Sequence, residues 1–332
     1  MKIRGNPSVL GRVVMAATAG VIAAFLLGAR GERRVRRYHT PTSNSQPGEL
    51  AAGPEGALWF TERAGNRIGR ITSEGVITEF PLPTPGSHPS FITLGADGNL
   101  WFTETVAGRI GRMTPSGDLA EFAIPGGGSP AGITAGPDGN VWFADEAGAI
   151  GRVSRDGGIF EFPVSSGAQP YAIVAGDNNL WFTEPNVNMI GKMNTGGGLL
   201  EYVVPTRNAN PTLIATGGDH NYWFVETPPD EPFAPEPRIG RISSLGNFLD
   251  FTLGSRESVA GALAVGPDGR VWFTDTGRQL IRALTWFGEP TRIKIPVSEP
   301  YGIVAGPDHA IWFTETPDVI GRIDLGPKEW KH

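Results

Sequence analysis

The segment 89–104 reads Pro89-Ser90-Phe91-Ile92-Thr93-Leu94-Gly95-Ala96-Asp97-Gly98-Asn99-Leu100-Trp101-Phe102-Thr103-Glu104, and versions of it return throughout this 332-residue chain. The Trp-Phe pair within it occurs seven times, at intervals of 39 to 49 residues. The seven tryptophans are Trp59, Trp101, Trp142, Trp181, Trp223, Trp272 and Trp312. A period near 40 residues is typical of architectures in which each unit packs against the next.

Each copy contains four short runs rich in β-branched and aromatic residues, and each run is closed by Gly, Asn, Asp or Pro. In the second copy the runs are Pro89 to Gly95, Leu100 to Glu104, Ile110 to Met113 and the pair Glu121-Phe122. This pattern predicts a four-stranded antiparallel meander. One such sheet cannot bury its aromatic face alone, so the copies must stack. The fold class is therefore all-β, a seven-bladed β-propeller of four-stranded antiparallel blades.

The two ends of the repeat array complete each other. The last copy stops after Val319-Ile320-Gly321-Arg322-Ile323 and lacks a fourth strand, whereas residues 35–42 align with the fourth-strand segment 77–84. We expect this N-terminal strand to close blade 7, because closure removes an open sheet edge. The propeller domain is therefore predicted to span residues 35–332.

Residues 1–34 are predicted to be a signal peptide or a membrane-anchor segment. Lys2, Arg4 and Arg12 precede an uncharged apolar run over residues 13–29, which is short for a transmembrane helix. Five arginines follow the run within residues 30–37, and positive charge there opposes translocation. We expect an exported or membrane-anchored, extracytoplasmic protein, with membrane anchoring through residues 13–29. A cytoplasmic protein with a disordered extension or a wrongly chosen start codon is the alternative.

Composition excludes several classes of function. The chain has no cysteine, which rules out disulfides, a Cys-ligated metal and a thiol nucleophile. The net charge is −6, yet the first 37 residues hold eight of the 28 basic residues and one of the 34 acidic ones, so the remainder is strongly acidic. An acidic body repels phosphate backbones, which argues against a nucleic-acid partner. Nothing in the sequence indicates an oligomer, and a monomer is expected.

An acidic residue follows the Trp-Phe pair in every copy. These residues are Glu62, Glu104, Asp145, Glu184, Glu226, Asp275 and Glu315. A ring of seven carboxylates suggests a cation site, but a group that every blade carries is better explained by a structural need such as pairing with a neighbouring strand. The tryptophans are likewise interpreted as packing between blades, and the Gly-Pro-Asp-Gly sequences as turns.

Function is expected where the copies differ, at the start of each first strand, which lines the channel mouth. A template proline marks this point in six copies, and Ala260 replaces it in the sixth blade. Residues before it are Gln46, His88, Ser129, Gln169, Asn210, Val259 and Glu299, and residues after it are Gly48, Ser90, Ala131, Tyr171, Thr212, Gly261 and Tyr301. This polar and aromatic ring predicts a site for a small-molecule or peptide ligand.

We assign substrate binding to Gln46, Gln169, Tyr171, Asn210 and Thr212 within this ring. A proline-rich insertion at residues 227–238 lies on the same face. It is either a wall or lid over the mouth or a tolerated surface loop.

The repeats resemble the virginiamycin B lyase (streptogramin lyase) family over residues 35–325, most clearly in segments 89–95 and 100–104. The resemblance implies a seven-bladed propeller with a role in antibiotic resistance, which linearises a cyclic depsipeptide by elimination. It also implies a histidine that removes the Cα proton beside the ester. Mg²⁺ held by glutamates polarises the ester carbonyl in this scheme.

Of the family's site residues, one has a counterpart here. The family's Glu-Pro-His of blade 7 reads Glu299-Pro300-Tyr301, so Glu299 matches the metal-binding glutamate and Tyr301 replaces the catalytic histidine. A second glutamate and a substrate-binding histidine fall at Thr316 and Gly261. Tyrosine, with a pKa near 10, is a weak base at neutral pH.

Three functions remain open from the sequence. The first is a carbon–oxygen lyase in which Glu299 holds Mg²⁺ and His88 or Tyr301 acts as the acid or base. The second is a non-catalytic extracytoplasmic propeller that binds a ligand. The third is a lactonase-like hydrolase, which normally needs several carboxylates and Asn on the axis, where Asn210 and Glu299 qualify.

Overall fold

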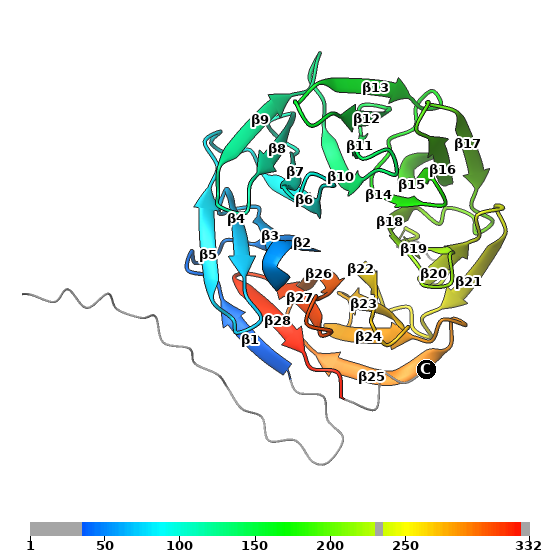
Figure 1. Cartoon of the computed structure of the whole chain (residues 1–332). Coiled ribbons are helices and arrows are strands. Elements are labelled where there is room, and N and C mark those ends of the chain that lie inside the picture. Colours follow the sequence, from blue (N-terminus) through cyan, green and yellow to red (C-terminus); the bar gives the residue numbers. More distant parts are fainter. Residues whose placement is uncertain (1–34, 230–234, 327–332) are drawn as a thin grey trace, which may run out of the picture.

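The computed structural model describes residues 35–229 and 235–326, which form seven four-stranded antiparallel sheets arranged in a ring (Figure 1). Blades 1 to 3 contain β2 (Pro47–Ala52), β3 (Leu58–Glu62), β4 (Arg67–Ile71) and β5 (Ile77–Pro81); β6 (Pro89–Leu94), β7 (Leu100–Glu104), β8 (Arg109–Met113) and β9 (Leu119–Ala123); and β10 (Pro130–Ala135), β11 (Val141–Asp145), β12 (Ala149–Val153) and β13 (Ile159–Pro163).

Blades 4 to 7 contain β14 (Ile173–Gly176), β15 (Asn179–Glu184), β16 (Met189–Asn194) and β17 (Leu199–Val203); β18 (Pro211–Thr216), β19 (Tyr222–Glu226), β20 (Arg238–Ile242) and β21 (Phe248–Thr252); β22 (Ala260–Val265), β23 (Val271–Asp275), β24 (Leu280–Leu284) and β25 (Pro290–Pro296); and β26 (Pro300–Ala305), β27 (Ile311–Glu315), β28 (Val319–Ile323) and β1 (Val35–His39). Short 3₁₀ turns η1 (Pro54–Gly56) and η2 (Pro185–Val187) complete the described elements. The predicted fold class is confirmed.

Blade 7 is completed by the N-terminal strand, as predicted. β1 pairs antiparallel with β28, with Val35 opposite Ile323 and His39 opposite Val319. The Tyr38 ring stacks on Trp312 at a centroid distance of 6.0 Å. It also lies against Gly75 of blade 1, where a Cβ would come within 2.0 Å of the ring. Figure 1 shows β1 at the outer edge beside β28, so both ends of the array meet in one sheet.

Replacing Tyr38 with alanine is expected to destabilise the propeller by about 3 kcal/mol, the usual cost of deleting a large buried ring. The ring is 9% exposed and joins blade 7 to blade 1. Urea unfolding of the full chain measures the loss, and Tyr38→Phe, which keeps the ring, is the matched control. Equal midpoints for wild type and Tyr38→Ala would show that closure contributes little stability.

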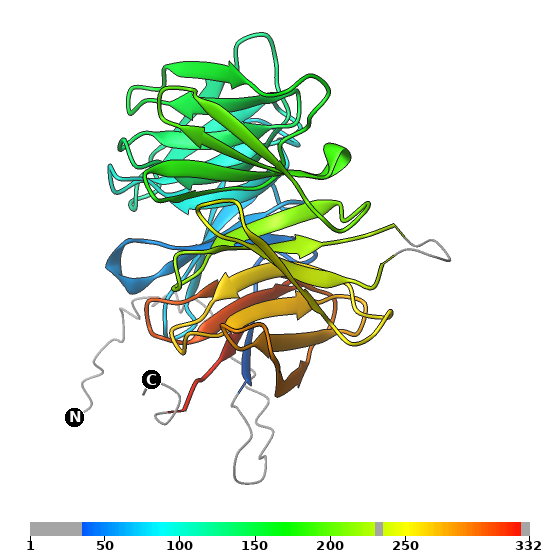
Figure 2. The same cartoon turned by 90° about the vertical axis from the view of Figure 1, so that its right-hand side faces the viewer.

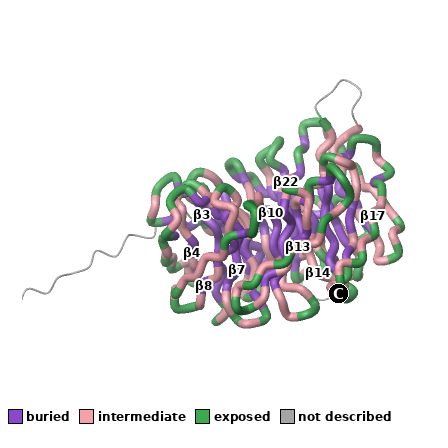
Figure 3. The backbone as a smooth tube through the Cα atoms, turned by 90° about the horizontal axis from the view of Figure 1, so that it is seen from above, coloured by how far each residue is buried: buried purple, intermediate pink, exposed green. Residues whose placement is uncertain are grey.

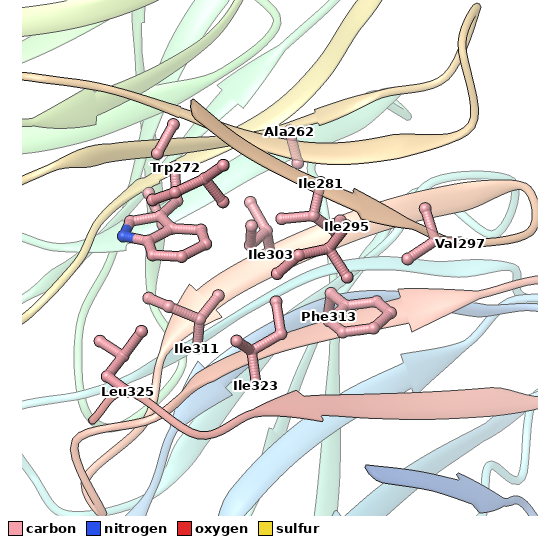
Figure 4. Close-up of a cluster of buried hydrophobic side chains, with 13 residues drawn as sticks. Ala262, Trp272, Ile281, Ile295, Val297, Ile303, Ile311, Phe313, Ile323 and Leu325 are labelled. Carbon is pink, nitrogen blue, oxygen red and sulfur yellow. The ribbon is translucent and has the colours of Figure 1, made fainter. Parts of the chain in front are cut away.

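Hydrophobic clusters lie between adjacent blades, as the tryptophans predicted. Trp59 of blade 1 is fully buried and packs with Leu100, Phe102 and Met113 of blade 2. Burial is concentrated within the blades and exposure in the loops of both faces (Figure 3). Figure 4 shows the cluster shared by blades 6 and 7, in which Ile281 and Ile295 face Ile303 and Phe313. Each blade therefore depends on its neighbour for its apolar core.

The Gly-Pro-Asp-Gly sequences form turns that also position the tryptophans. Asp138 Oδ1 accepts a hydrogen bond from Trp142 Nε1 at 2.9 Å, and Asp308 Oδ1 does the same for Trp312 at 2.9 Å. An aspartate four residues before the ring thus satisfies the buried indole N–H, which would otherwise be costly to leave unpaired.

Two regions singled out in the sequence fall partly or wholly outside the described residues. These are the predicted signal or anchor segment, residues 1–34, and residues 230–234 of the 227–238 insertion. Figure 2 gives the side view of the ring. Within residues 35–229 and 235–326, no helix is long and apolar enough to cross a membrane.

Candidate functional site

A pocket of about 380 Å³ opens at the channel mouth where the first strands begin. Its lining residues are Glu49, Tyr171, Pro185, Asn210, Thr212, Leu213, Gly261, Ala262, Thr276 and Tyr301. They come from blades 1, 4, 5, 6 and 7, so the pocket belongs to the ring as a whole. Its volume is within the range of about 300–1,000 Å³ that small-molecule sites occupy.

Irregular strand pairing at the mouth turns side chains toward the pocket. In blade 1 the register between β2 and β3 shifts between Pro47 and Leu50, and in blade 7 it shifts between Pro300 and Ile303. Glu49 and Tyr301 lie inside these two irregularities. Bulges of this kind redirect side chains and are frequent beside active sites.

Hydroxyl groups of the second strands hold the mouth segments in place across blade boundaries. Thr314 Oγ1 accepts a hydrogen bond from Gly302 N at 2.8 Å and donates one to Gly48 O at 3.0 Å. Thr274 Oγ1 donates to Tyr301 O at 3.2 Å in the same way. The backbone on both sides of Glu49 and Tyr301 is therefore tied to a neighbouring blade.

Glu49 is the acidic group of this pocket. Its Oε1 atom is enclosed and has no hydrogen-bond partner within the described structure. Burial raises the pKa of Glu49 to about 7, although the nearby Arg63 cation acts in the opposite direction. Near neutral pH the carboxyl group is therefore divided between its protonated and ionised forms, which suits a group that accepts or donates a proton.

Arg63 and Tyr301 lie near Glu49, and of these two Tyr301 lines the pocket. The Arg63 guanidinium carbon lies 4.0 Å from the centroid of the Tyr301 ring, a cation–π contact. Arg63 Nε is buried without a hydrogen-bond partner in the described residues. Burial raises the pKa of Tyr301 above its usual value. Tyr301 therefore keeps its proton at neutral pH, which makes its hydroxyl a hydrogen-bond donor.

Tyr171 occupies the opposite side of the pocket. Burial raises the pKa of its hydroxyl, so this group is also a donor at neutral pH. Its ring meets Phe91 edge-on, with centroids 5.7 Å apart and planes at 85°. The edge-on contact fixes the orientation of the ring, so Tyr171 presents a rigid aromatic surface to a ligand.

The structure brings together four of the eight predicted site residues, because Tyr171, Thr212, Asn210 and Tyr301 all line the pocket. The remaining four lie outside its lining. These are His88, Gln46, Gln169 and Glu299. His88 is half-buried, and the other three are exposed. Of the five predicted residues that precede a template proline, Asn210 alone lines the pocket, whereas all three predicted residues that follow one line it.

The surroundings of Glu299 do not fit a magnesium site made by the protein. Its Oε2 atom accepts a hydrogen bond from Thr316 Oγ1 at 2.6 Å. Over the described ranges, no group of three or more His, Asp or Glu side chains is placed to hold a metal. One exposed carboxylate with a hydroxyl is a poor donor set for a cation that prefers octahedral oxygen coordination. Mg²⁺ stays a prediction from the resemblance.

Sequence reasoning missed Glu49 and Arg63, although both leave a signal. Glu49 is the second residue after the template proline, where the other blades have Phe91, Gly132, Ala172, Leu213, Ala262 and Gly302. At a position that is apolar or glycine in the other six blades, a single carboxylate indicates a functional role. Arg63 follows the template acid of blade 1, at a position where Thr105, Thr227, Thr276 and Thr316 are uncharged.

The ring of template acids is structural, and the acids are buried. In blades 1 to 5 each acid faces a carboxylate of the fourth strand of its own blade. The pairs are Glu62–Glu79, Glu104–Glu121, Asp145–Glu161, Glu184–Glu201 and Glu226–Asp250. In blade 6 Arg282 pairs with Asp275 at 3.0 Å, and in blade 7 Arg37 pairs with Glu315 at 2.8 Å.

Burial and the second carboxylate raise the pKa of the inner acid in the pairs, to about 8 for Glu62, Glu184 and Glu226 and about 7 for Glu104. The outer acid is held by the next segment of the chain in blade 1, where Glu79 accepts hydrogen bonds from Thr42 N at 2.8 Å and Thr42 Oγ1 at 2.6 Å. In these four pairs the inner acid therefore holds a proton during part or all of the time at neutral pH.

Comparisons with known proteins agree with the fold. The profile of the Virginiamycin B lyase family matches residues 27–229 and 232–328. A solved streptogramin B lyase is 31% identical, with a TM-score of 0.82, over 89% of this chain and 98% of that chain. Selenomethionine-substituted virginiamycin B lyase from Staphylococcus aureus is 34% identical, with a TM-score of 0.82, over 89% and 100% of the two chains.

A third solved structure is a catalytically inactive histidine-to-alanine variant of virginiamycin B lyase from Staphylococcus aureus with quinupristin. It is 33% identical to this chain, with a TM-score of 0.82, and the match covers 89% of this chain and all of that chain. The seven-bladed ring, the closure by β1 and the family match over nearly the whole propeller lead to one conclusion: this chain belongs to the virginiamycin B lyase family.

Proposed function

We propose that this chain is a carbon–oxygen lyase that opens an ester within a cyclic depsipeptide bound at the channel mouth, with Glu49 as its base. The observation that carries the proposal is the Glu49 carboxyl group, which lines the mouth pocket, has an unpartnered oxygen and has a pKa of about 7. A base with a pKa near the working pH is the most effective proton acceptor.

The reaction is an elimination and needs no water. The Glu49 carboxylate takes a proton from the carbon next to the one that bears the ester oxygen. The electron pair left behind forms a carbon–carbon double bond, the carbon–oxygen bond breaks, and the ester leaves as a carboxylate. Negative charge therefore develops on the carboxyl oxygens, where cations and hydrogen-bond donors stabilise it.

Arg63 and Tyr301 are suited to stabilise that developing charge. The guanidinium is permanently charged, and the Tyr301 hydroxyl keeps its proton because burial raises its pKa. Both groups lie near enough to Glu49 to interact with it electrostatically. Tyr301 lines the pocket, and Arg63 contacts the Tyr301 ring. The Arg63 guanidinium thus supplies the positive charge that stabilises the leaving carboxylate, and no step depends on Glu299.

The test is incubation of the full chain with quinupristin, followed by tandem mass spectrometry. We expect a linear product of unchanged mass, because elimination adds no water, and we expect it to form equally with and without EDTA. A product heavier by one water would indicate a hydrolase. Loss of activity with EDTA would contradict the role given to Arg63, and quinupristin intact in both buffers would reject the lyase.

A ligand-binding protein without turnover is the second candidate. It is favoured by the replacement of family site residues by Tyr301, Gly261 and Thr316. Calorimetric binding of quinupristin without any product would support it. The lactonase-like hydrolase has less support, since the described residues include no group of three or more His, Asp or Glu side chains placed to hold a metal.

A further inference from the structure

A second and larger cavity of about 600 Å³ lies between blades 5 and 6, on the face opposite to the mouth. It is bounded by the first turns of the two blades, residues 217–219 and 267–270, and by the last turn of blade 6, residues 285–287. Each of these turns joins two strands whose other ends face the mouth, which places the cavity on the opposite face. Blades 5 and 6, which contain β20 and β24, are neighbours in the ring (Figure 1).

Two exposed aromatic side chains distinguish this cavity. Trp286 is 53% exposed and Phe287 is 62% exposed, and their ring centroids are 4.3 Å apart. The same two positions of the other turns hold Ser73-Glu74, Pro115-Ser116, Arg155-Asp156, Thr195-Gly196 and Ser244-Leu245. An aromatic pair on a solvent-exposed turn has no packing role in the blade, so it indicates binding.

The turn that carries the aromatic pair is rigid. Thr285 N donates to Glu289 O at 2.8 Å, and Gly288 N donates to Thr285 O at 2.8 Å. Gly288 has a φ of 84° and lies against the Phe251 ring of blade 5, where a Cβ would approach to 2.0 Å. Arg241 of blade 5 donates to Trp286 O at 3.1 Å. The aromatic pair is therefore held at a fixed distance from blade 5.

The corresponding space between blades 2 and 3 provides an internal comparison. Arg112 there donates to Arg155 O, as Arg241 does to Trp286 O, so the two junctions share one bonding pattern. That space is lined by Arg155 and Asp97 and leaves no room for a water-sized molecule. The cavity between blades 5 and 6 is thus specific to this pair of blades and does not arise from the repeated structure alone.

The polar groups of the cavity favour an uncharged ligand. Asp219 is paired with Arg241 at 3.3 Å, and Asp268 is paired with Arg270 at 2.8 Å. Asp268 also accepts hydrogen bonds from Arg270 N and Trp272 Nε1, which uses about three of the roughly four acceptor positions of a carboxylate. Asp219 likewise accepts hydrogen bonds from Asn221 N, Asn221 Nδ2, Trp223 Nε1 and Arg241. The two carboxylates are therefore occupied, and their side chains are 8% and 1% exposed. Charge is balanced, and the polar groups left for a ligand are the Arg270 and Thr285 side chains and the backbone of the turns.

We propose that the cavity between blades 5 and 6 binds a neutral oligosaccharide built of pyranose rings. A pyranose ring has an apolar C–H face, which suits the Trp286–Phe287 platform, and hydroxyl groups at its edge, which suit the Arg270 and Thr285 side chains and the turn backbone. This site is separate from the mouth pocket and does not depend on the lyase proposal.

The test is a titration of the full chain by calorimetry with two neutral probes, cellohexaose and chitohexaose. We expect saturable binding of at least one probe and a loss of at least tenfold in affinity for Trp286→Ala. Leu245→Ala is the matched control, because Leu245 is 82% exposed at the position of Phe287 in the blade 5 turn. Its affinity should equal that of the wild type.

Three results would overturn the proposal. One is the absence of binding by either probe up to about 10 mM, beyond which recognition is negligible. Another is equal affinity of wild type and Trp286→Ala, which would place the sugar elsewhere. The third is binding of a polyproline peptide with the same dependence on Trp286 but no binding of sugar, which would make the cavity a peptide site. Circular dichroism checks that each variant is folded.

Discussion

Glu49→Gln is expected to lower the turnover of quinupristin by about 10²–10⁴-fold, the usual contribution of a general base. Glutamine keeps the size and polarity of the side chain but cannot accept the proton. Because Glu49 has a pKa of about 7, wild-type activity should rise with pH through that value as the carboxyl group ionises. Mass spectrometry of product formed between pH 5.5 and 9 measures both effects.

Glu55→Gln is the matched control for this change. Glu55 lies in the same blade, and its side chain is 73% exposed in a pair with Arg70. Its substitution should leave turnover unchanged. A decisive contrast comes from Glu299→Gln. If that variant loses activity while Glu49→Gln keeps it, the chemistry depends on the rim carboxylate that the family resemblance indicated, and the assignment of Glu49 is wrong.

Raising the pH from 5 to 9 is expected to destabilise the propeller by several kcal/mol, through the protons that the buried inner acids hold. In the unfolded chain these carboxyl groups titrate near 4.5, whereas burial raises their pKa to about 7 or 8 in the folded chain. Between these values the folded state holds more protons, so the free energy of unfolding falls as pH rises.

This contribution is fully present below about pH 4.5 and is lost as pH passes through 7 to 8. One pKa unit corresponds to about 1.4 kcal/mol, so even a discounted sum over four sites is comparable with the net stability of a domain, about 5–15 kcal/mol. Urea unfolding at a series of pH values measures the slope.

Glu62→Gln should flatten this slope, because an amide can donate to Glu79 without titrating. The exposed Glu55→Gln variant should keep the wild-type slope. An unfolding free energy that rises between pH 5 and 8 would show that the inner acids do not hold these protons.

The sequence was sufficient to predict the fold because the same strand and turn signals recur in every copy. The Trp-Phe period, the turn residues and the complementary ends at residues 35–42 and 319–323 all predicted the same closed ring, and closure by β1 is confirmed. The pocket opens at the mouth, where the copies differ. Which mouth residues line it could not be predicted, because a bulge in the first strand decides which side chains turn inward, as Glu299 and Tyr301 on either side of Pro300 show.

The family resemblance by itself does not identify Glu49. Aligning the expected histidine with Tyr301 identifies what is missing from blade 7 but does not identify a group that replaces it from blade 1. The inter-blade contact of Gly302 with Gly48 and Glu49, where a Cβ would come within 2.6 Å of Gly48 O, exists only in three dimensions. The pairing of acid with acid inside each blade was likewise hidden, because opposite charge is the usual expectation.

Closure of blade 7 by the N-terminal strand determines when, during synthesis of the chain, the pocket can form. Glu49 lies near the start of the chain and Tyr301 near its end, so they become neighbours when blade 7 docks on blade 1. A ribosome must therefore have made nearly the entire propeller before the pocket exists. A fragment that ends before residue 300 carries the proposed base and Arg63 without Tyr301, so ligand turnover would itself report that synthesis of the propeller is nearly complete.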